Sequence, residues 1–281
     1  MNIFYAILLG IIQGITEFLP VSSTAHLTLA GKVFGLVEMT DPEDWTAFIA
    51  IMQLGTVAAV ISYFIKDYIA FGNSFLHDFH IKNLTGKREW SNGSRLAGRI
   101  ILGTLPVAVV GWLFKDLIEG TFTKEISTIA TSLIALALLL YWAEKVGKHK
   151  RTEEQTTWLD ALIVGFAQAI ALIPGSSRSG TTITAGLFLG LDRETAARFS
   201  FHLSIPAVIA SGFFEMYHAR HHIGDLGIVS LIVAAVTSGI VGYLSISFLI
   251  KYLHKHTTQL FIVYRIILGV LLWGFLLFKI I

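Results

Sequence analysis

Residues 17–26 read EFLPVSSTAH and interrupt a stretch of the chain that is otherwise apolar enough for lipid. Pro20 fixes its backbone φ angle and lacks an N–H, so a helix entering this stretch ends before it. The carboxylate of Glu17, the hydroxyls of the SST run and the imidazole of His26 are costly to bury in hydrocarbon. The stretch therefore predicts a helix, a break and a second helix, with polar groups gathered at the break.

A second apolar segment, 161–191, is interrupted in the same way by IPGSSRSGTT at 173–182. Irregular backbone at membrane depth persists only where protein or a wet cavity satisfies its hydrogen bonds. We therefore expect 3–35 and 161–191 to form two re-entrant helix–break–helix hairpins.

The whole chain has the composition of an integral membrane protein, because 54% of its 281 residues are hydrophobic and only 14% are charged. It has no cysteine, which excludes disulfides and cysteine metal sites. The net charge of +2 gives no indication of a nucleic-acid partner. We expect an all-α fold forming one membrane domain over 1–281, with a polar loop at 66–99. Six long apolar stretches predict about six transmembrane helices, at 45–65, 100–114, 126–143, 199–214, 226–250 and 257–278.

The two hairpins are related by an internal repeat. A slide of 155 positions aligns Gln13 with Gln168 and many neighbouring residues, and across the break a slide of 154 brings Ser23 onto Ser177. One hairpin and three spans per half make an odd number of crossings, so the halves are predicted to have inverted topology. The predicted repeats cover approximately 1–146 and 158–281.

Charge asymmetry predicts the orientation. With six spans, five Lys and Arg lie on the side that holds both termini and thirteen lie on the other. The positive-inside rule then places the thirteen in the cytoplasm and both termini outside.

The first hairpin gathers groups suited to phosphoryl chemistry. Ser22 or Ser23 is expected to cap the helix that follows Pro20. Their spacing from His26, four and three residues, places both hydroxyls on the same helix face as the imidazole. Glu17 ends the incoming helix beside the break, one turn after Gln13.

The second hairpin resembles an anion cradle. Arg178 offers a planar fork for phosphate oxygens at the start of a helix, where N–H groups and the dipole also favour an anion. We expect the two hairpin tips to meet, so that Glu17, His26 and Arg178 are mutual partners. Gln53, His202 and Ser204 are further candidates for the lining of the cavity. The remaining phosphate-binding candidates are Ser22, Thr24, Gly175, Ser176, Ser177, Ser179 and Thr182.

The motifs QGITEFLPVSSTAH at 13–26 and PGSSRSGTT at 174–182 closely resemble those of the bacterial undecaprenyl-diphosphate phosphatase family, also called the bacitracin-resistance protein family. The resemblance covers essentially the whole chain. It implies an inner-membrane enzyme that hydrolyses undecaprenyl diphosphate to the monophosphate and recycles the lipid carrier of peptidoglycan synthesis. It further implies bacitracin resistance, an active site open to the outer face, and a homodimer.

The resemblance also carries roles to particular residues. Glu17, Ser23, His26 and Arg178 match the family's functional positions. The position of Gln13 is Glu in some members, and the amide here weakens a two-carboxylate scheme. The family activity is linked to Mg²⁺ or Ca²⁺, for which Glu17 is the candidate ligand.

Several mechanisms remain open at this point. Ser23 attacks the terminal phosphorus with His26 as base, or His26 attacks directly, or His26 activates water while Ser23 only binds phosphate. A lipid-phosphate flippase or anion transporter is the alternative function, because broken helices meeting at the midplane are typical of transporters. A transporter needs the anion clamp but not the cluster of serine, histidine and carboxylate, so that cluster favours an enzyme.

Overall fold

The structure, a computed structural model, describes residues 2–36, 42–85, 90–114, 125–218 and 227–279. Over these ranges the chain forms eleven α-helices and one short 3-10 helix, and its only β-bridge joins Arg151 to Leu191. The elements are α1 (Ile3–Phe18), α2 (Ser23–Val33), α4 (Pro42–Tyr63), α5 (Ile65–Thr85), α6 (Asn92–Leu113), α9 (Ile126–Val146), η1 (Glu153–Gln155), α10 (Trp158–Ile170), α11 (Arg178–Phe188), α12 (Arg193–His218), α14 (Ile228–Lys255) and α15 (Gln259–Leu277).

Four of the described helices, α6, α9, α14 and α15, are long and apolar enough to cross a membrane. A fifth span is available if Phe48–Tyr63 and Ile65–His80, which meet at a bend of 70°, are counted together. Large apolar side chains lie on the outside of these helices, with Trp112 80% exposed, as lipid-facing side chains do. The chain is therefore a multi-pass helical membrane protein.

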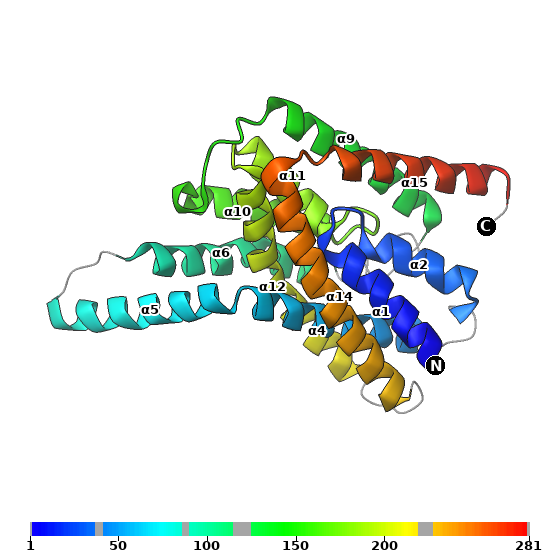
Figure 1. Ribbon diagram of the computed structural model, residues 1–281, viewed down its shortest axis with the longest axis horizontal. Coiled ribbons are helices and arrows are strands. Elements are labelled where there is room, and N and C mark those ends of the chain that lie inside the picture. Colours follow the sequence, from blue (N-terminus) through cyan, green and yellow to red (C-terminus); the bar gives the residue numbers. More distant parts are fainter. Residues whose placement is uncertain (1, 37–41, 86–89, 115–124, 219–226, 280–281) are drawn as a thin grey trace.

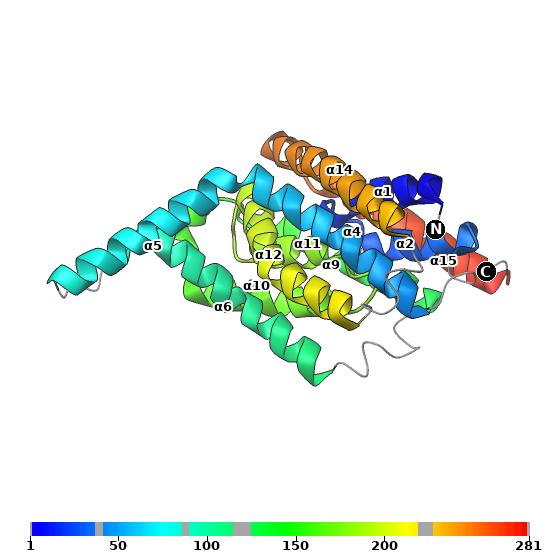
Figure 2. The same cartoon turned by 90° about the horizontal axis from the view of Figure 1, so that it is seen from below.

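The expected polar loop at 66–99 was wrong, because α5 occupies its first half and α6 begins at Asn92. Figures 1 and 2 show α5 projecting from the body of the molecule. Ile65, Ile69 and Leu76 are exposed along it at a helical spacing, between the charged residues. A count of charges alone concealed this periodicity.

Helices of one half of the chain pack against helices of the other half. The first arm of each hairpin packs against a helix of the other half: α1 against α14, and α10 against α6. In Figure 1, α15 lies beside α9, and the contacts confirm that these last helices of the two halves pair with each other. This reciprocal arrangement brings both hairpin breaks into the centre of the molecule.

Both breaks end at a serine with positive φ. Ser22 (φ 75°) caps α2 by accepting from the N–H of Ala25, and Ser177 (φ 66°) caps α11 by accepting from the N–H of Gly180. Residues other than glycine seldom adopt this conformation, and such positions concentrate at functional sites.

These caps correct the predicted register across the break. The structure aligns Ser22 with Ser177, and hence Ser23 with Arg178, so the slide remains 155. The prolines and adjacent serines of the two motifs favoured a slide of 154. The second break is longer, because α10 ends at Ile170 and seven residues precede Arg178.

The α6–α10 crossing is close because Gly103 and Gly165 face each other there. A Cβ added to Gly165 would lie 2.2 Å from the backbone oxygen of Gly103. Small residues at such crossings let membrane helices approach. This contact holds the first arm of the second hairpin against α6.

Substitution Gly165→Ala is expected to destabilise the protein by about 1–3 kcal/mol, because the methyl group forces two backbones apart. The matched control is Gly274→Ala in α15, where nothing lies within 4 Å of the added Cβ. That control is expected to be neutral or stabilising by up to about 1 kcal/mol, since alanine favours helix more than glycine. Thermal unfolding in detergent measures both, and equal midpoints for the two variants would contradict the tight crossing.

Candidate active site

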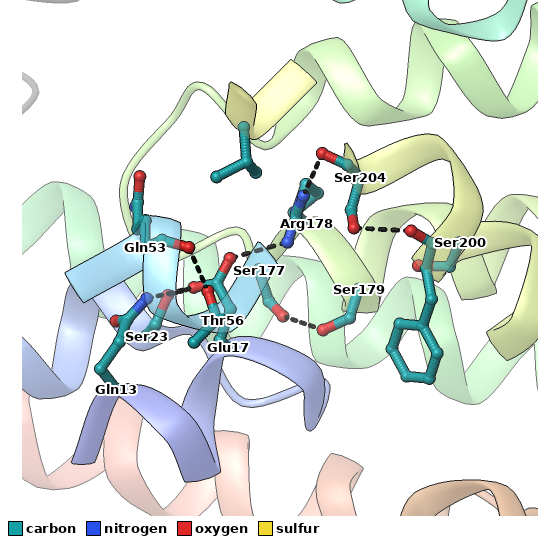
Figure 3. Close-up of polar contacts among 12 residues, drawn as sticks. Gln13, Glu17, Ser23, Gln53, Thr56, Ser177, Arg178, Ser179, Ser200 and Ser204 are labelled. Atoms are coloured by element: carbon teal, nitrogen blue, oxygen red, sulfur yellow. Dashed lines mark hydrogen bonds and ion pairs between the residues drawn. The ribbon is translucent and has the colours of Figure 1, made fainter. Parts of the chain in front are cut away.

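The Glu17 carboxylate joins the two hairpins. Its Oε1 accepts from Arg178 Nη2 at 2.7 Å, and its Oε2 accepts from Ser23 Oγ at 2.7 Å. Gln13, one turn earlier on α1, donates its Nε2–H to the same Oε2 at 3.0 Å. Figure 3 shows the carboxylate between these three side chains. The structure therefore brings together four of the residues singled out from the sequence.

Arg178 is held from two sides. Its Nη1 donates to the backbone oxygen of Ser204 on α12 at 3.1 Å, while Nη2 faces Glu17. The side chains of Arg178 and Glu17 are only 17% and 6% exposed. Their attraction is stronger there than at a water-exposed surface, because less solvent screens the two charges.

Glu17, Ser23 and Arg178 line a cavity of about 520 Å³. Its polar part combines the carboxylate and the hydroxyls of the first hairpin with the arginine and the cap of the second. Its apolar part comes from α6, α12 and the loop that follows α10. The polar lining residues are Glu17, Ser22, Ser23, Thr24, Gln53, Thr104, Gln168, Ser177, Arg178 and Ser211, and the apolar ones include Val107, Trp112, Leu172, Ala207, Val208 and Phe214.

Not every residue expected in the anion cradle lines the cavity. Ser179 donates its hydroxyl to the backbone oxygen of Leu19 at 3.1 Å, which ties the second hairpin to the break of the first. Thr182 donates to the backbone oxygen of Arg178 at 2.7 Å and faces Ser200. Ser176 is fully buried outside the lining. These residues support the loop, whereas Gly175 and Ser177 face the cavity.

The loop before α11 has room only for glycine at position 175. Gly175 has φ 89°, and an added Cβ would lie 2.1 Å from Ser132 Oγ. Ser132 donates that hydroxyl to the backbone oxygen of Pro174 at 2.5 Å, while Arg265 Nη2 donates to the backbone oxygen of Ser176 at 2.9 Å. With its carbonyls held from behind, the loop is fixed at the cavity wall.

The spacing predicted that His26 contacts the two serine hydroxyls. The structure shows other partners. Its Nδ1 lies 2.7 Å from the backbone oxygen of Ser22, and its Nε2 lies 2.5 Å from Tyr264 Oη. A carbonyl only accepts, so Nδ1 carries the proton and Nε2 of the neutral ring accepts from Tyr264. The imidazole therefore bonds the Ser22 backbone and Tyr264 of α15, and unlike the two serines it lies outside the cavity lining.

A family model for "Bacitracin resistance protein BacA" matches residues 6–271. The chain belongs to the BacA family. Both hairpin breaks and every cavity residue described above fall inside the matched range.

Three curated proteins similar to this BacA family member are each named "Undecaprenyl-diphosphatase". The protein from Syntrophobacter fumaroxidans is 52% identical over 97% of both chains. Those from Chlorobium phaeovibrioides and Chlorobaculum parvum are 50% and 48% identical, covering 97% and 96% of this chain and 96% and 95% of their own.

The donor set of this BacA family member does not fit a resident divalent cation. Both Glu17 oxygens already accept hydrogen bonds from Arg178, Ser23 and Gln13, and the position one turn earlier holds an amide. Within the described residues no group of three or more His, Asp or Glu side chains is arranged as ligands. The cavity lining offers one carboxylate, so a bound magnesium would take most of its oxygen ligands from water or from substrate phosphate.

Sequence reasoning missed three polar residues of this BacA family site. Tyr264 and Arg265 lie far along the chain from both motifs, and no local pattern marks them. Gln168 was aligned with Gln13 but given no role, although it lines the cavity. Of the further candidates, Gln53 lines the cavity, whereas Ser204 reaches Arg178 through its carbonyl and His202 bonds Tyr68 away from it.

Proposed function

We propose that this protein hydrolyses undecaprenyl diphosphate to undecaprenyl phosphate and inorganic phosphate. One observation carries the proposal: Glu17 bonds both Ser23 of its own hairpin and Arg178 of the other, and all three residues line one cavity. A nucleophile, a base and an anion clamp are the groups that phosphoryl transfer requires. Curated relatives similar over nearly the whole chain are named for the same activity.

The cavity suits a lipid with a diphosphate head. The apolar wall formed by Val107, Trp112 and Phe214 fits a prenyl chain, and the polar part fits the phosphates. Removing the terminal phosphate regenerates the lipid carrier of peptidoglycan synthesis. The same reaction removes the diphosphate form from the membrane, which accounts for the bacitracin resistance in the family description.

The geometry favours Ser23 as nucleophile and Glu17 as its base. Ser23 Oγ attacks the terminal phosphorus, its proton passes to Glu17 Oε2 at 2.7 Å, and the anhydride P–O bond breaks to release the prenyl monophosphate. Water then attacks the phosphoserine, and the Glu17 proton returns to Ser23 Oγ as inorganic phosphate leaves. Arg178 binds the transferred phosphate, and in doing so releases Glu17 from their ion pair.

His26 is assigned a positioning role, because its two nitrogens hold the Ser22 backbone and Tyr264. Ser22 caps the helix on which Ser23 is the first residue, so the imidazole fixes the direction of the nucleophile. In this assignment His26 neither attacks phosphorus nor accepts the serine proton.

Rapid quenching of His26→Ala with a labelled prenyl diphosphate is expected to trap phosphoserine, because the nucleophile and its base remain. Turnover should fall by about 10- to 100-fold as Ser23 loses its orientation. Absence of label in His26→Ala, with label retained in Ser23→Ala, would make the histidine the nucleophile. The variant must elute from size exclusion as the wild type does.

We further propose the finer topology and the assembly. Six crossings and two re-entrant hairpins form two inverted repeats, near 1–146 and 158–281, with both termini outside and the cavity open to the outer face. The reciprocal packing of α1 on α14 and α10 on α6 supports the repeat. Cysteine labelling at both termini in intact cells tests the orientation. The protein is proposed to be a homodimer, which mass photometry in detergent tests.

The test of the activity is phosphate release from a prenyl diphosphate by the purified protein in detergent, with and without EDTA. Release by wild type supports the phosphatase, and its absence from a folded protein under every cation condition would favour a lipid-phosphate transporter. Because the donor set does not fit a resident cation, we propose that Mg²⁺ or Ca²⁺ enters bound to the diphosphate and offsets its charge. EDTA is then expected to raise KM more than it lowers kcat.

A further inference from the structure

Gln168 occupies the last turn of α10 and lines the active-site cavity. The residue is 1% exposed. Neither its Nε2 nor its Oε1 has a hydrogen-bond partner in the part of the chain that the structure describes. A buried primary amide with both ends unpartnered is unusual, because buried polar groups are nearly always satisfied.

Comparison with the first half of the internal repeat explains why the Gln168 amide has no hydrogen-bond partner among the described residues. Gln13, the counterpart of Gln168 in the first hairpin, donates to Glu17 four residues later at 3.0 Å. The 155-residue slide places Leu172 where Glu17 stands, so the second hairpin has no carboxylate for its glutamine. The first glutamine is held by its own helix, whereas the second remains available at the cavity wall.

An amide in this position costs stability. Leaving a buried donor unsatisfied costs about 1–3 kcal/mol relative to an apolar side chain of similar shape. Thr104, a polar residue of α6 that lines the same cavity, donates its hydroxyl to the backbone oxygen of Ile100 instead. A ligand with acceptor oxygens offsets this cost, and the cavity beside Arg178 and Ser177 is built for such oxygens.

We infer that Gln168 is a substrate-binding residue whose Nε2–H donates to a non-bridging oxygen of the lipid diphosphate. This inference rests on the proposed function of the same cavity. A neutral donor adds a directional hydrogen bond without adding charge. Gln168 lies on α10 of the second hairpin, whereas Ser23 lies on α2 of the first. The second hairpin thus binds the diphosphate through both of its arms, with Gln168 before the break and Arg178 after it.

The test compares Gln168→Leu with Thr156→Val. Loss of one hydrogen bond to a charged phosphate is expected to lower kcat/KM about 10- to 100-fold, mainly by raising KM. The thermal midpoint of Gln168→Leu should stay at or above that of wild type, because an unsatisfied amide is replaced by an apolar side chain. Thr156 is buried, bonds Glu153 and Arg99, and lies outside the cavity lining. Its variant should show the reverse, a lower midpoint with unchanged kcat/KM.

Gln168→Glu adds a second readout. The introduced carboxylate repels the diphosphate, so KM should rise above that of Gln168→Leu at neutral pH. The difference should shrink as the pH falls and the carboxyl becomes protonated. A residue that only packs α10 against α6 would give no such pH dependence.

Two results would overturn the inference. One is wild-type kcat/KM in Gln168→Leu, and the other is a loss of activity matched by a fall in thermal midpoint. Wild type and Arg178→Ala are measured in parallel. If wild type releases phosphate, Arg178→Ala does not and Gln168→Leu resembles wild type, only the role of Gln168 fails. If wild type releases none, the proposed function itself fails.

Discussion

Replacement of Arg178 by alanine is expected to lower kcat/KM for a prenyl diphosphate by at least about 10³-fold. The guanidinium is the one cationic group that lines the described cavity, and positioned arginines at phosphoryl-transfer sites contribute factors of this size. Arg178→Lys keeps the charge but loses the planar fork, so it should recover only part of the activity. Steady-state phosphate release measures both variants.

The control for Arg178→Ala must separate chemistry from folding. Without the arginine, the buried Glu17 carboxylate has no counter-charge, which is itself destabilising. The double variant Glu17→Gln/Arg178→Ala removes that charge as well. Because the double variant also lacks the proposed base, it shows only whether the unpaired carboxylate causes the instability. The lost activity belongs to the reaction if Arg178→Ala itself elutes from size exclusion as the wild type does. Near wild-type turnover by Arg178→Ala would remove the arginine from the site.

Substitution Ser23→Ala is expected to lower kcat by at least about 10⁴-fold with little change in KM, because a nucleophile acts in the chemical step. No phosphoenzyme should be trapped after rapid quench. Ser245→Ala is the matched control: Ser245 is buried on α14, donates to the backbone oxygen of Val241 and lies outside the cavity lining. It should turn over as the wild type does.

A residual rate within about tenfold of wild type in Ser23→Ala would show that water attacks phosphorus directly. Glu17 would then act on water rather than on the serine. Restoration of the trapped intermediate by Ser23→Thr would support the hydroxyl as nucleophile. In the first outcome the 2.7 Å hydrogen bond between Ser23 and Glu17 only positions the two groups, and in the second it is the path of the serine proton.

Local signals in the sequence predicted the two breaks, the serine cap after Pro20 and the approach of Glu17 to Arg178. Proline and serine act on the backbone within a few residues, so their effects are visible in a short stretch. The partner of His26 was not predictable in this way. Helical spacing predicted contacts with the serine hydroxyls, whereas Tyr264, 238 residues away, is the group that bonds Nε2.

The register of the repeat failed for a related reason. Sequence identity across the break aligned Ser23 with Ser177. The backbone instead aligns Ser22 with Ser177, because each is the N-cap of its helix and each has a positive φ. Residue identity cannot reveal that the second break is longer than the first. The role inferred for Gln168 was not predicted either, because only the structure shows that its amide is buried and unpartnered at the cavity.

Ser23 and Arg178 occupy the same place in their two helices, each the first residue after a serine cap. If a single ancestral half was copied, both sites first carried one and the same residue. Such an ancestor had the same residue at both positions, and two copies of one residue do not combine a nucleophile with a clamp for its target. The reaction could arise only once the copies had diverged at this position, so the active site is younger than the symmetry that holds it.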